Sequence, residues 1–359
     1  MAESPRGVNP ADAAVVLKAL LDTWDVAAER MIATVARRLA QGITSDGWAE
    51  VKARQVLAIR DELLAIMART DTSTPRLAAA ALEEARRLGA SRIARGTNGI
   101  LIGSRPEVVQ QLAEQLAGRL AATMLPVVRA HEDTFRRAVT DTELLMQTGT
   151  ITRRDAVAMS VDKLLADGQD RFADQAGRRW HLDSYVRMAG RTAAGQVAVQ
   201  GQLDEMTARG LDVVVVSDSP RECHLCRPWE GKLLSISGVS VGSEVDGHRV
   251  VAPVAVAFAA GLQHPNCTHR LDRHTPGLTV VDEPDQDPKG YREQQQLRAM
   301  ERRMRELKRR QAAAREFGDT HTGRKLRQQQ RDLSGRIAAH TDRTGQIRKR
   351  DRERPAGAR

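Results

Sequence analysis

The chain has 359 residues, of which 41% are hydrophobic and only 3% aromatic, so any core must rely largely on small aliphatic side chains. This composition favours closely packed helices and argues against β-sandwiches and β-barrels. The net charge is +10, but residues 289–359 carry 22 Lys and Arg against 9 Asp and Glu, a net charge of +13 that leaves the rest nearly neutral. Residues 1–10 are polar, so we expect no signal peptide, and no apolar run reaches the roughly 18–20 residues of a membrane span. We therefore expect folding in a reducing cytoplasm and no membrane partner.

Residues 1–177 form the first predicted region, and their hydrophobic spacing indicates helices. Apolar residues recur every three or four positions from Val16 to Leu39, which predicts a helix that opens near Pro10 and ends at Gly42. A second helix is expected from Ser45, as its N-cap, to about Met67.

Proline and glycine punctuate the next part of this region. The segment 71–75 (DTSTP) predicts a break, followed by a short helix over 76–88. The glycine-bearing stretch 95–104 is expected to be a loop. Pro106 should restart a helix, and Pro126 should kink it. Thr152 is the expected N-cap of a further helix.

Residues 178–281 change in character and predict a small α+β module. A long helical stretch over 171–209 leads into it and ends at Gly210. Short β-branched or apolar runs at 213–216, 232–236 and 248–251, separated by glycines, then predict strands.

The chain is expected to end in a basic tail. Residues 282–288 are an acidic, proline-bearing linker, and residues 289–359 predict a basic helical or coiled-coil tail. Its two helices are expected over 291–317 and 321–340, joined by a turn at Gly318. The predicted fold class is therefore mainly α, with a long helical N-terminal region, a small α+β zinc-binding module and a basic helical C-terminal tail.

The three cysteines lie close together in the module. Cys223 and Cys226 form a C-x2-C pair, and His264 and Cys267 repeat the x2 spacing further along the chain. An odd number of cysteines suits a disulfide framework poorly. Two such pairs supply the four ligands of tetrahedral zinc, so we predict that Cys223, Cys226, His264 and Cys267 bind zinc. Four protein ligands would close the coordination shell and make the site structural.

Other assignments of these residues remain open. His269 is the rival fourth ligand, and His224 is a more distant candidate. Three reduced cysteines that pack as small hydrophobic side chains would explain the same residues without a metal.

Zinc enzymes fit the sequence less well. A nucleic-acid deaminase needs H-x-E upstream of P-C-x-x-C, but two residues separate Pro220 from Cys223. A metalloprotease needs H-E-x-x-H, and Phe135 occupies the place of its second histidine. Asn266, between two histidines, is suggestive of an HNH-type nuclease, but no general-base histidine precedes it on a strand. A zinc-dependent nuclease and a zinc-ribbon DNA-binding protein remain the alternatives.

Several motifs in this region carry a family resemblance. Residues 223–235 read C-x-x-C-x-x-W-x-G-K-x-x-S after a strand, and residues 264–267 read H-P-N-C. Upstream, residues 185–192 read Y-x-x-M-x-x-R-T, and residues 274–277 read HTPG. Together these motifs resemble the phage minor capsid protein family related to the MuF head protein.

The resemblance implies a non-enzymatic head-morphogenesis protein of a tailed bacteriophage. Such a protein would be a virion component, assembled in the bacterial cytoplasm, with the portal and the major capsid or scaffolding proteins as partners. The basic tail suits packaged DNA, although the glutamates along it are placed to pair with its arginines. Non-specific DNA contact and docking of a helical hairpin on protein are therefore both expected roles for the tail.

Overall fold

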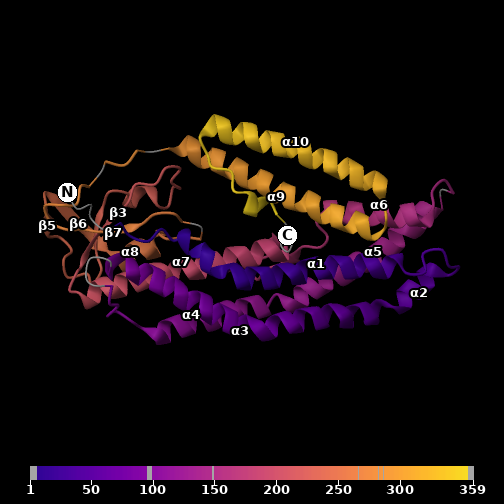
Figure 1. The fold of residues 1–359 in the computed structure, drawn as a ribbon, viewed down its shortest axis with the longest axis horizontal. Helices are drawn as coiled ribbons and strands as arrows, with labels where there is room; N and C mark the ends of the chain where they lie inside the picture. The colour runs from indigo at the N-terminus through magenta and orange to yellow at the C-terminus, as the bar shows by residue number, and fades with distance from the viewer. Residues whose placement is uncertain are drawn as a thin grey trace. The chain divides into compact units, whose positions relative to one another are not determined.

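The computed structural model describes residues 6–94, 99–147, 149–265, 267–281, 283–285 and 287–354. Helices dominate, and a small mixed sheet and a two-stranded hairpin accompany them, which confirms the predicted fold class (Figure 1). The helices are η1 (Asp12–Leu17), α1 (Lys18–Ala40), α2 (Trp48–Arg54), α3 (Val56–Ala94), α4 (Pro106–Ala121), α5 (Met124–Met146), α6 (Arg153–Ala166), α7 (Leu182–Ala208), η2 (Arg227–Trp229), α8 (Val254–Ala259), α9 (Pro288–Glu316), α10 (Thr320–Thr344) and η3 (Arg350–Glu353). The strands are β1 (Phe172–Ala173), β2 (Arg179–Trp180), β3 (Val213–Val216), β4 (Leu233–Ser235), β5 (Glu244–Val245), β6 (His248–Pro253) and β7 (Leu271–Arg273).

The chain divides into two compact units, each assembled from three segments. Unit 1 contains Met1–Leu20, Thr74–Gly118 and Arg187–Gln294, and unit 2 contains Leu21–Ser73, Arg119–Val186 and Gln295–Arg359. Several unit boundaries fall inside helices, including α3 and α7.

Unit 1 is built around the α7 segment that follows Val186. Gly89 of α3 lies against this helix, since a Cβ added to it would lie 1.7 Å from the carbonyl oxygen of Ala198. Only glycine permits this approach of two backbones. Buried Gln202 accepts a hydrogen bond from the Val8 amide (2.7 Å) and donates one to the Leu271 carbonyl, so α7 holds both the N-terminal segment and strand β7.

The sheet of unit 1 has the strand order β5-β6-β4-β3-β7. Strand β3 is antiparallel to β4 and β7, whereas β4 is parallel to β6. Val215, Leu233 and Val250 form a buried cluster across the three central strands, which is why these runs of β-branched and aliphatic residues form strands. The three strands expected at 213–216, 232–236 and 248–251 are thus confirmed, while β5 and β7 were not predicted.

Unit 2 is helical apart from a small hairpin. The periodic positions of α1 provide much of its core, with Trp24, Met31 and Leu39 fully buried. Helices α9 and α10 lie side by side (Figure 1) and share a buried cluster. Its members are Leu297, Met304, Leu307, Leu326, Leu333 and Ile337. The prediction of two helices joined by a turn at Gly318 is confirmed, and Gly318 has the positive φ of 67° that such a turn favours.

The expected break at residues 71–75 is wrong, because α3 continues through Pro75. A proline inside a helix deprives the carbonyl four residues earlier of its donor and typically costs ~3 kcal/mol. Here the hydroxyls of Thr70 and Thr72 donate to the carbonyls of Ile66 and Ala68 at 3.0 and 2.9 Å. These hydrogen bonds let both threonines occupy helical positions. Buried apolar side chains before and after Pro75 supply the packing that outweighs local propensity.

Two other helix boundaries differ from the sequence prediction. Helix α2 starts at Trp48 after Gly47, which adopts a left-handed φ of 64°, so Ser45 is not the N-cap. Pro126 does not kink a continuous helix: α4 ends at Ala121, and Pro126 lies in the first turn of α5, where no backbone N–H is needed. Of the expected loop 95–104, residues 95–98 lie outside the described residues, and residues 99–104 are not helical.

The helix expected from Arg171 begins only at Leu182, because a hairpin precedes it. Strands β1 and β2 pair, and the Asp174 carboxylate organises the turn between them. Its Oδ1 accepts from the amides of Ala176 and Arg178 at 3.0 and 2.9 Å. Aspartate at the start of a turn favours this local bonding over helix formation. The predicted N-cap at Thr152 is confirmed, because its hydroxyl accepts from the Asp155 amide.

Candidate metal centre

The C-x2-C pair lies in the loop that follows strand β3. The amides of Cys226 and Arg227 both donate to the Cys223 carbonyl, at 3.2 and 3.1 Å, and this tight turn brings the two thiols to the same side of the loop. The Gly231 amide donates to the Val216 carbonyl at 2.9 Å and closes the loop back onto the end of the strand.

The second pair lies between α8 and strand β7. The Cys267 amide donates to the His264 carbonyl at 2.9 Å, so this pair forms a turn like that of the first. Antiparallel pairing of Val216 with Leu271 places the residues after β3 beside the residues before β7. The sheet register therefore brings together two pairs that are far apart in the sequence.

The ligand atoms form two overlapping groups. Cys223, Cys226 and His264 each offer one ligand atom within 4.8 Å of the others, and so do Cys226, Cys267 and His269. Cys226 belongs to both groups. All three cysteines are free and buried, His269 is buried and His264 is half-buried. The exposed His224 belongs to neither group.

The separations between these atoms suit a thiolate-rich metal site. Zn–S bonds of ~2.3 Å place two thiolates ~3.8 Å apart along one edge of a tetrahedron. The sulfur atoms of Cys226 and Cys267 are 3.7 Å apart. The Sγ of Cys223 lies 2.9 Å from Nε2 of His264, a hydrogen-bond distance rather than a tetrahedral edge. Thiolate and imidazole ligands suit a soft or borderline ion such as zinc.

Each candidate histidine has a partner on its other ring nitrogen. Nδ1 of His264 lies 2.9 Å from the Pro265 carbonyl oxygen. Nδ1 of His269 faces Cys267 at 3.4 Å, and its Nε2 lies 2.7 Å from Oε1 of the fully buried Glu230. Metal-bound histidines characteristically donate their second N–H to a carbonyl or carboxylate. Both histidines therefore meet this requirement.

The thiols of Cys226 and Cys267 and the imidazole of His269 change the pKa values of one another. The hydrogen bond with Cys267, together with burial, raises the pKa of Cys226. The same hydrogen bond and the neighbouring His269, against the effect of burial, lower the pKa of Cys267 to about 4. Burial opposes protonation of His269, but hydrogen bonds with Cys267 and Glu230 overcome it and raise its pKa. Of these groups, Cys267 is therefore the one whose anionic form is favoured, and the protonated imidazole of His269 lies beside it.

Sequence reasoning missed the contact between Glu230 and His269. The spacing of cysteines and histidines reveals ligands, but no spacing rule links a glutamate in the first loop to a histidine 39 residues later. Trp229, the tryptophan of the motif in residues 223–235, is half-buried at the end of η2.

The residues around the cysteines give little support to a nuclease or to a zinc-ribbon DNA-binding protein. Asn266, on which a nuclease reading depends, lies outside the described residues. The module's Arg227 and Arg270 pair with Glu222 and Asp272 at 2.8 and 3.2 Å, so these cations are partly neutralised rather than presented to DNA.

In the described part of the chain, no helix is both long and apolar enough to cross a membrane. The family model of phage minor capsid protein 2 matches residues 8–342, far beyond the segment that carries the sequence motifs. No curated protein and no solved structure matches the chain. The family model covers nearly all of the sequence, including helices α1 to α9 and the Cys/His cluster. The chain therefore belongs to the phage minor capsid protein 2 family and is a component of the virion.

Proposed function

We propose that this protein is a structural, non-enzymatic component of the phage head that docks on the portal and on the major capsid or scaffolding proteins. The family match over residues 8–342 carries this proposal, because it includes the helices as well as the metal-binding motifs. Helices such as α3, with 39 residues, provide extended surfaces for protein contacts.

The metal centre fits this role because a structural metal ion would stabilise the fold. We assign zinc to Cys223, Cys226, His264 and Cys267, with His269 as the rival to His264. Four protein ligands leave no coordination position for a reactive water, which distinguishes a structural from a catalytic zinc. The same proposal includes a division of the chain into four parts. These are a helical region at 1–177, a module at 178–281, a linker at 282–288 and a tail at 289–359.

The full chain is expected to bind purified portal or capsid proteins of its own phage. Co-sedimentation with assembled portal rings and with capsid shells measures this, and major capsid protein in unassembled form serves as the control. If the chain binds none of these proteins and instead cleaves duplex DNA in a zinc-dependent manner, the nuclease alternative replaces docking.

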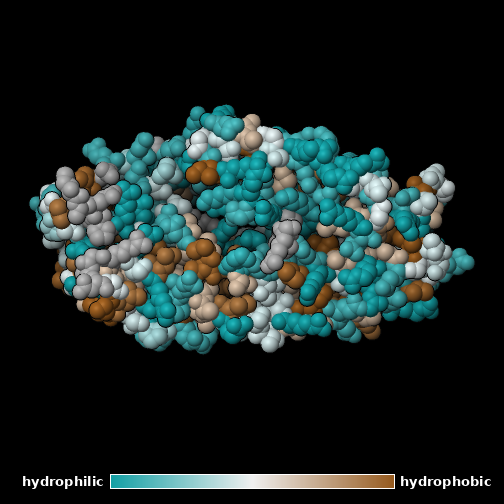
Figure 2. Space-filling view, viewed as in Figure 1, coloured by the Kyte–Doolittle hydropathy of each residue, from teal (hydrophilic) through white to brown (hydrophobic). Residues whose placement is uncertain are grey.

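We further propose that the exposed face of α10 is the part of the basic tail that contacts DNA. In α9, Arg309 and Arg310 are directed to Asp183 and Asp162, which reduces their availability. Helix α10 carries six Lys and Arg against two Asp. Its surface is predominantly hydrophilic (Figure 2). Among the described residues, no carboxylate pairs with its exposed cations Arg324, Lys325, Arg327, Arg331 and Arg336.

The triple variant Arg324→Gln/Arg327→Gln/Arg331→Gln is expected to weaken binding to duplex DNA of any sequence. Each lost phosphate contact should lower the log–log salt slope by ~0.9, because fewer counterions are released. Fluorescence anisotropy with two unrelated duplexes, from low to physiological salt, measures this effect. The control, Arg298→Gln/Arg303→Gln, removes two cations that pair with Glu301 and Glu306 on α9 and should change the slope little.

Loss of portal or capsid binding in the triple variant, with an unchanged salt slope, would assign the helical hairpin to protein docking instead. That outcome would contradict DNA contact by α10.

A further inference from the structure

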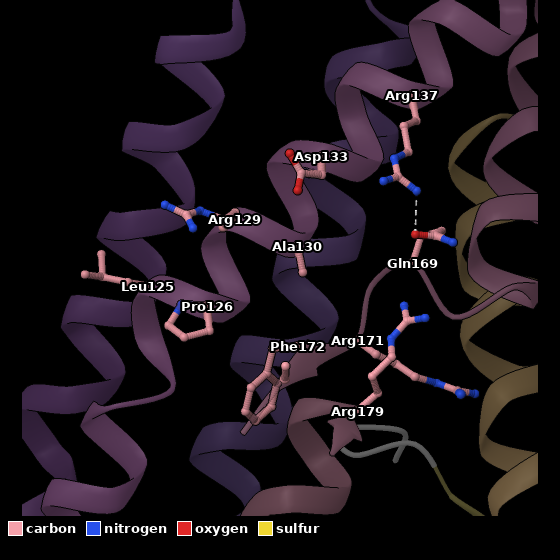
Figure 3. A pocket seen from close by; sticks show the side chains of 11 residues that line it. Leu125, Pro126, Arg129, Ala130, Asp133, Arg137, Gln169, Arg171, Phe172 and Arg179 are labelled. Atoms are coloured by element: carbon pink, nitrogen blue, oxygen red, sulfur yellow. Dashed lines mark hydrogen bonds between the residues drawn. The ribbon is translucent and has the colours of Figure 1, made fainter. Parts of the chain in front are cut away.

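Unit 2 contains a pocket lined by several arginines, next to the hairpin of β1 and β2. The sequence predicted neither the pocket nor the hairpin. It has a volume of about 470 Å³ and lies between α5, the loop after α6 and strands β1 and β2 (Figure 3). Arg129 and Arg137 come from α5, Arg171 from the loop and Arg179 from β2. Of the residues that line the pocket in the described part of the chain, Asp133 alone is acidic. Pockets of this size typically hold small ligands.

Three of these arginines are held by groups other than carboxylates. Arg137 donates to Oε1 of Gln169 at 2.7 Å, and Arg179 donates to the Gly168 carbonyl at 2.7 Å. Arg171 donates from Nε to Nε2 of His181 at 2.9 Å. Each contact orients a guanidinium group without neutralising it, and each leaves further N–H donors available. Figure 3 shows these three arginines on the same side of the pocket as Gln169, with Arg129 on the other side.

Their neighbours in the sequence behave differently. Arg136, next to Arg137, pairs with Glu132 at 2.6 Å, and Arg178, next to Arg179, pairs with Asp174 at 2.8 Å. Three arginines of α9 likewise pair with acids of α6 and α7, as in Arg310 with Asp162. Unit 2 therefore neutralises many of its arginines, but none of the carboxylates in the described residues forms an ion pair with the four arginines of the pocket.

The glycine at position 168 leaves the space that the Arg171 side chain occupies. Gly168 has a positive φ of 66°, and a Cβ there would lie 2.6 Å from Nε of Arg171. A larger residue would displace the arginine from its place beside His181. Several like charges in one pocket repel one another, and a bound anion removes that repulsion.

We propose that this pocket binds a phosphate group, either free or in the backbone of a nucleic acid. Guanidinium groups bind phosphate oxygens with paired, charge-assisted hydrogen bonds. The pocket is larger than a phosphate group requires, and Leu125, Pro126 and Phe172 give it an apolar side that accommodates the sugar or base attached to it. The site is separate from the metal centre, which belongs to unit 1, and from α10.

Titration calorimetry of the full chain with inorganic phosphate and with a short single-stranded oligonucleotide tests this proposal. The background variant Arg327→Gln/Arg331→Gln reduces any contribution of α10 to oligonucleotide binding. In that background, Arg137→Gln/Arg179→Gln is expected to weaken phosphate binding by about tenfold or more per arginine, the usual effect of losing a hydrogen bond to a charged group. Both side chains are exposed, so the variant should stay folded, which circular dichroism checks.

The matched control is Arg136→Gln/Arg178→Gln, which removes the same charge from the adjacent, ion-paired positions and should leave affinity unchanged. Oligonucleotide binding that falls in parallel with phosphate binding identifies the nucleic-acid backbone as the ligand. Phosphate binding alone identifies free phosphate. Equal losses in the pocket and control variants, no binding of either probe, or binding of polyglutamate in place of phosphate would overturn the proposal.

Discussion

Replacing Cys226 with serine is expected to remove zinc from the protein and to unfold the metal-bearing part of unit 1. Cys226 is the cysteine common to both ligand groups, and its side chain is fully buried. Structural zinc contributes folding free energy on the order of 10 kcal/mol in small zinc domains, more than the stability of most domains. Metal analysis should find about one zinc ion per wild-type chain and almost none in the variant. Limited proteolysis should cut the variant between β3 and β7.

His224→Ala is the matched control for this experiment. His224 lies between the two cysteines of the first pair, but it is exposed and outside both ligand groups, so the variant should keep its zinc and its protease resistance. A Cys226→Ser protein that remains folded and loses only a hydrolytic activity would make the zinc catalytic. Wild-type protein that never contains metal would leave the cysteines as packed hydrophobic residues.

The same measurement decides between the two histidines. If His264 is the ligand, His264→Ala should lose zinc, whereas Glu230→Gln should have little effect. If His269 is the ligand, Glu230→Gln should weaken zinc binding by roughly 10- to 100-fold, because the buried carboxylate orients the imidazole from its other nitrogen. Zinc affinity in competition with a chelator measures both variants.

The grouping of the cysteines and histidines was largely predictable, because the spacing of these residues is visible over a few positions of the sequence. Two x2 spacings place ligand pairs in tight turns, and the β-branched run at 213–216 predicts the strand that precedes the first pair. The antiparallel pairing of β3 with β7, which brings the pairs together, could not be predicted, because β7 is a three-residue strand without an alternating pattern. The Glu230–His269 contact depends on that pairing and was missed with it.

The errors in the helical regions have a common physical origin. Proline and hydroxyl residues at 71–75 favour a break locally, but buried side chains on either side keep α3 continuous. At 172–180 the error is the reverse one. The helical spacing of the sequence predicts a helix there, but the hydrogen bonds of the Asp174 carboxylate stabilise a hairpin turn instead. Burial of apolar side chains thus determines the structure at 71–75, and side-chain hydrogen bonds in a turn determine it at 172–180.

The charge of the tail was evident in the sequence, but the neutralisation of α9 was not. Arg305 and Arg309, four residues apart, lie on one face of α9 and both contact Asp183 at 3.2 Å. Asp183 is in the first turn of α7, where the helix dipole also favours a carboxylate. Because the partners are more than 100 residues apart, only the folded chain shows that these arginines belong to the interior of unit 2.

Asp183→Ala is therefore expected to destabilise unit 2 by about 3–5 kcal/mol, because it leaves buried guanidinium groups without their carboxylate. Asp183 is only 4% exposed, and the side chains of Arg305 and Arg309 are each 10% exposed. Asp332→Ala, on the exposed face of α10, is the control and should change stability by less than about 1 kcal/mol. Urea unfolding followed by circular dichroism compares the two variants.

A second variant separates the cost of unpaired charge from the value of the ion pair itself. The triple substitution Asp183→Leu/Arg305→Met/Arg309→Met replaces the buried charges with apolar side chains of similar length. It should recover most of the stability that Asp183→Ala loses, since apolar packing often equals a buried ion pair. If Asp183→Ala has no more effect than Asp332→Ala, the two arginines find other partners or water. In that case the Asp183 ion pairs add little, and α9 is held in unit 2 by its buried apolar side chains and by the pair of Arg310 with Asp162.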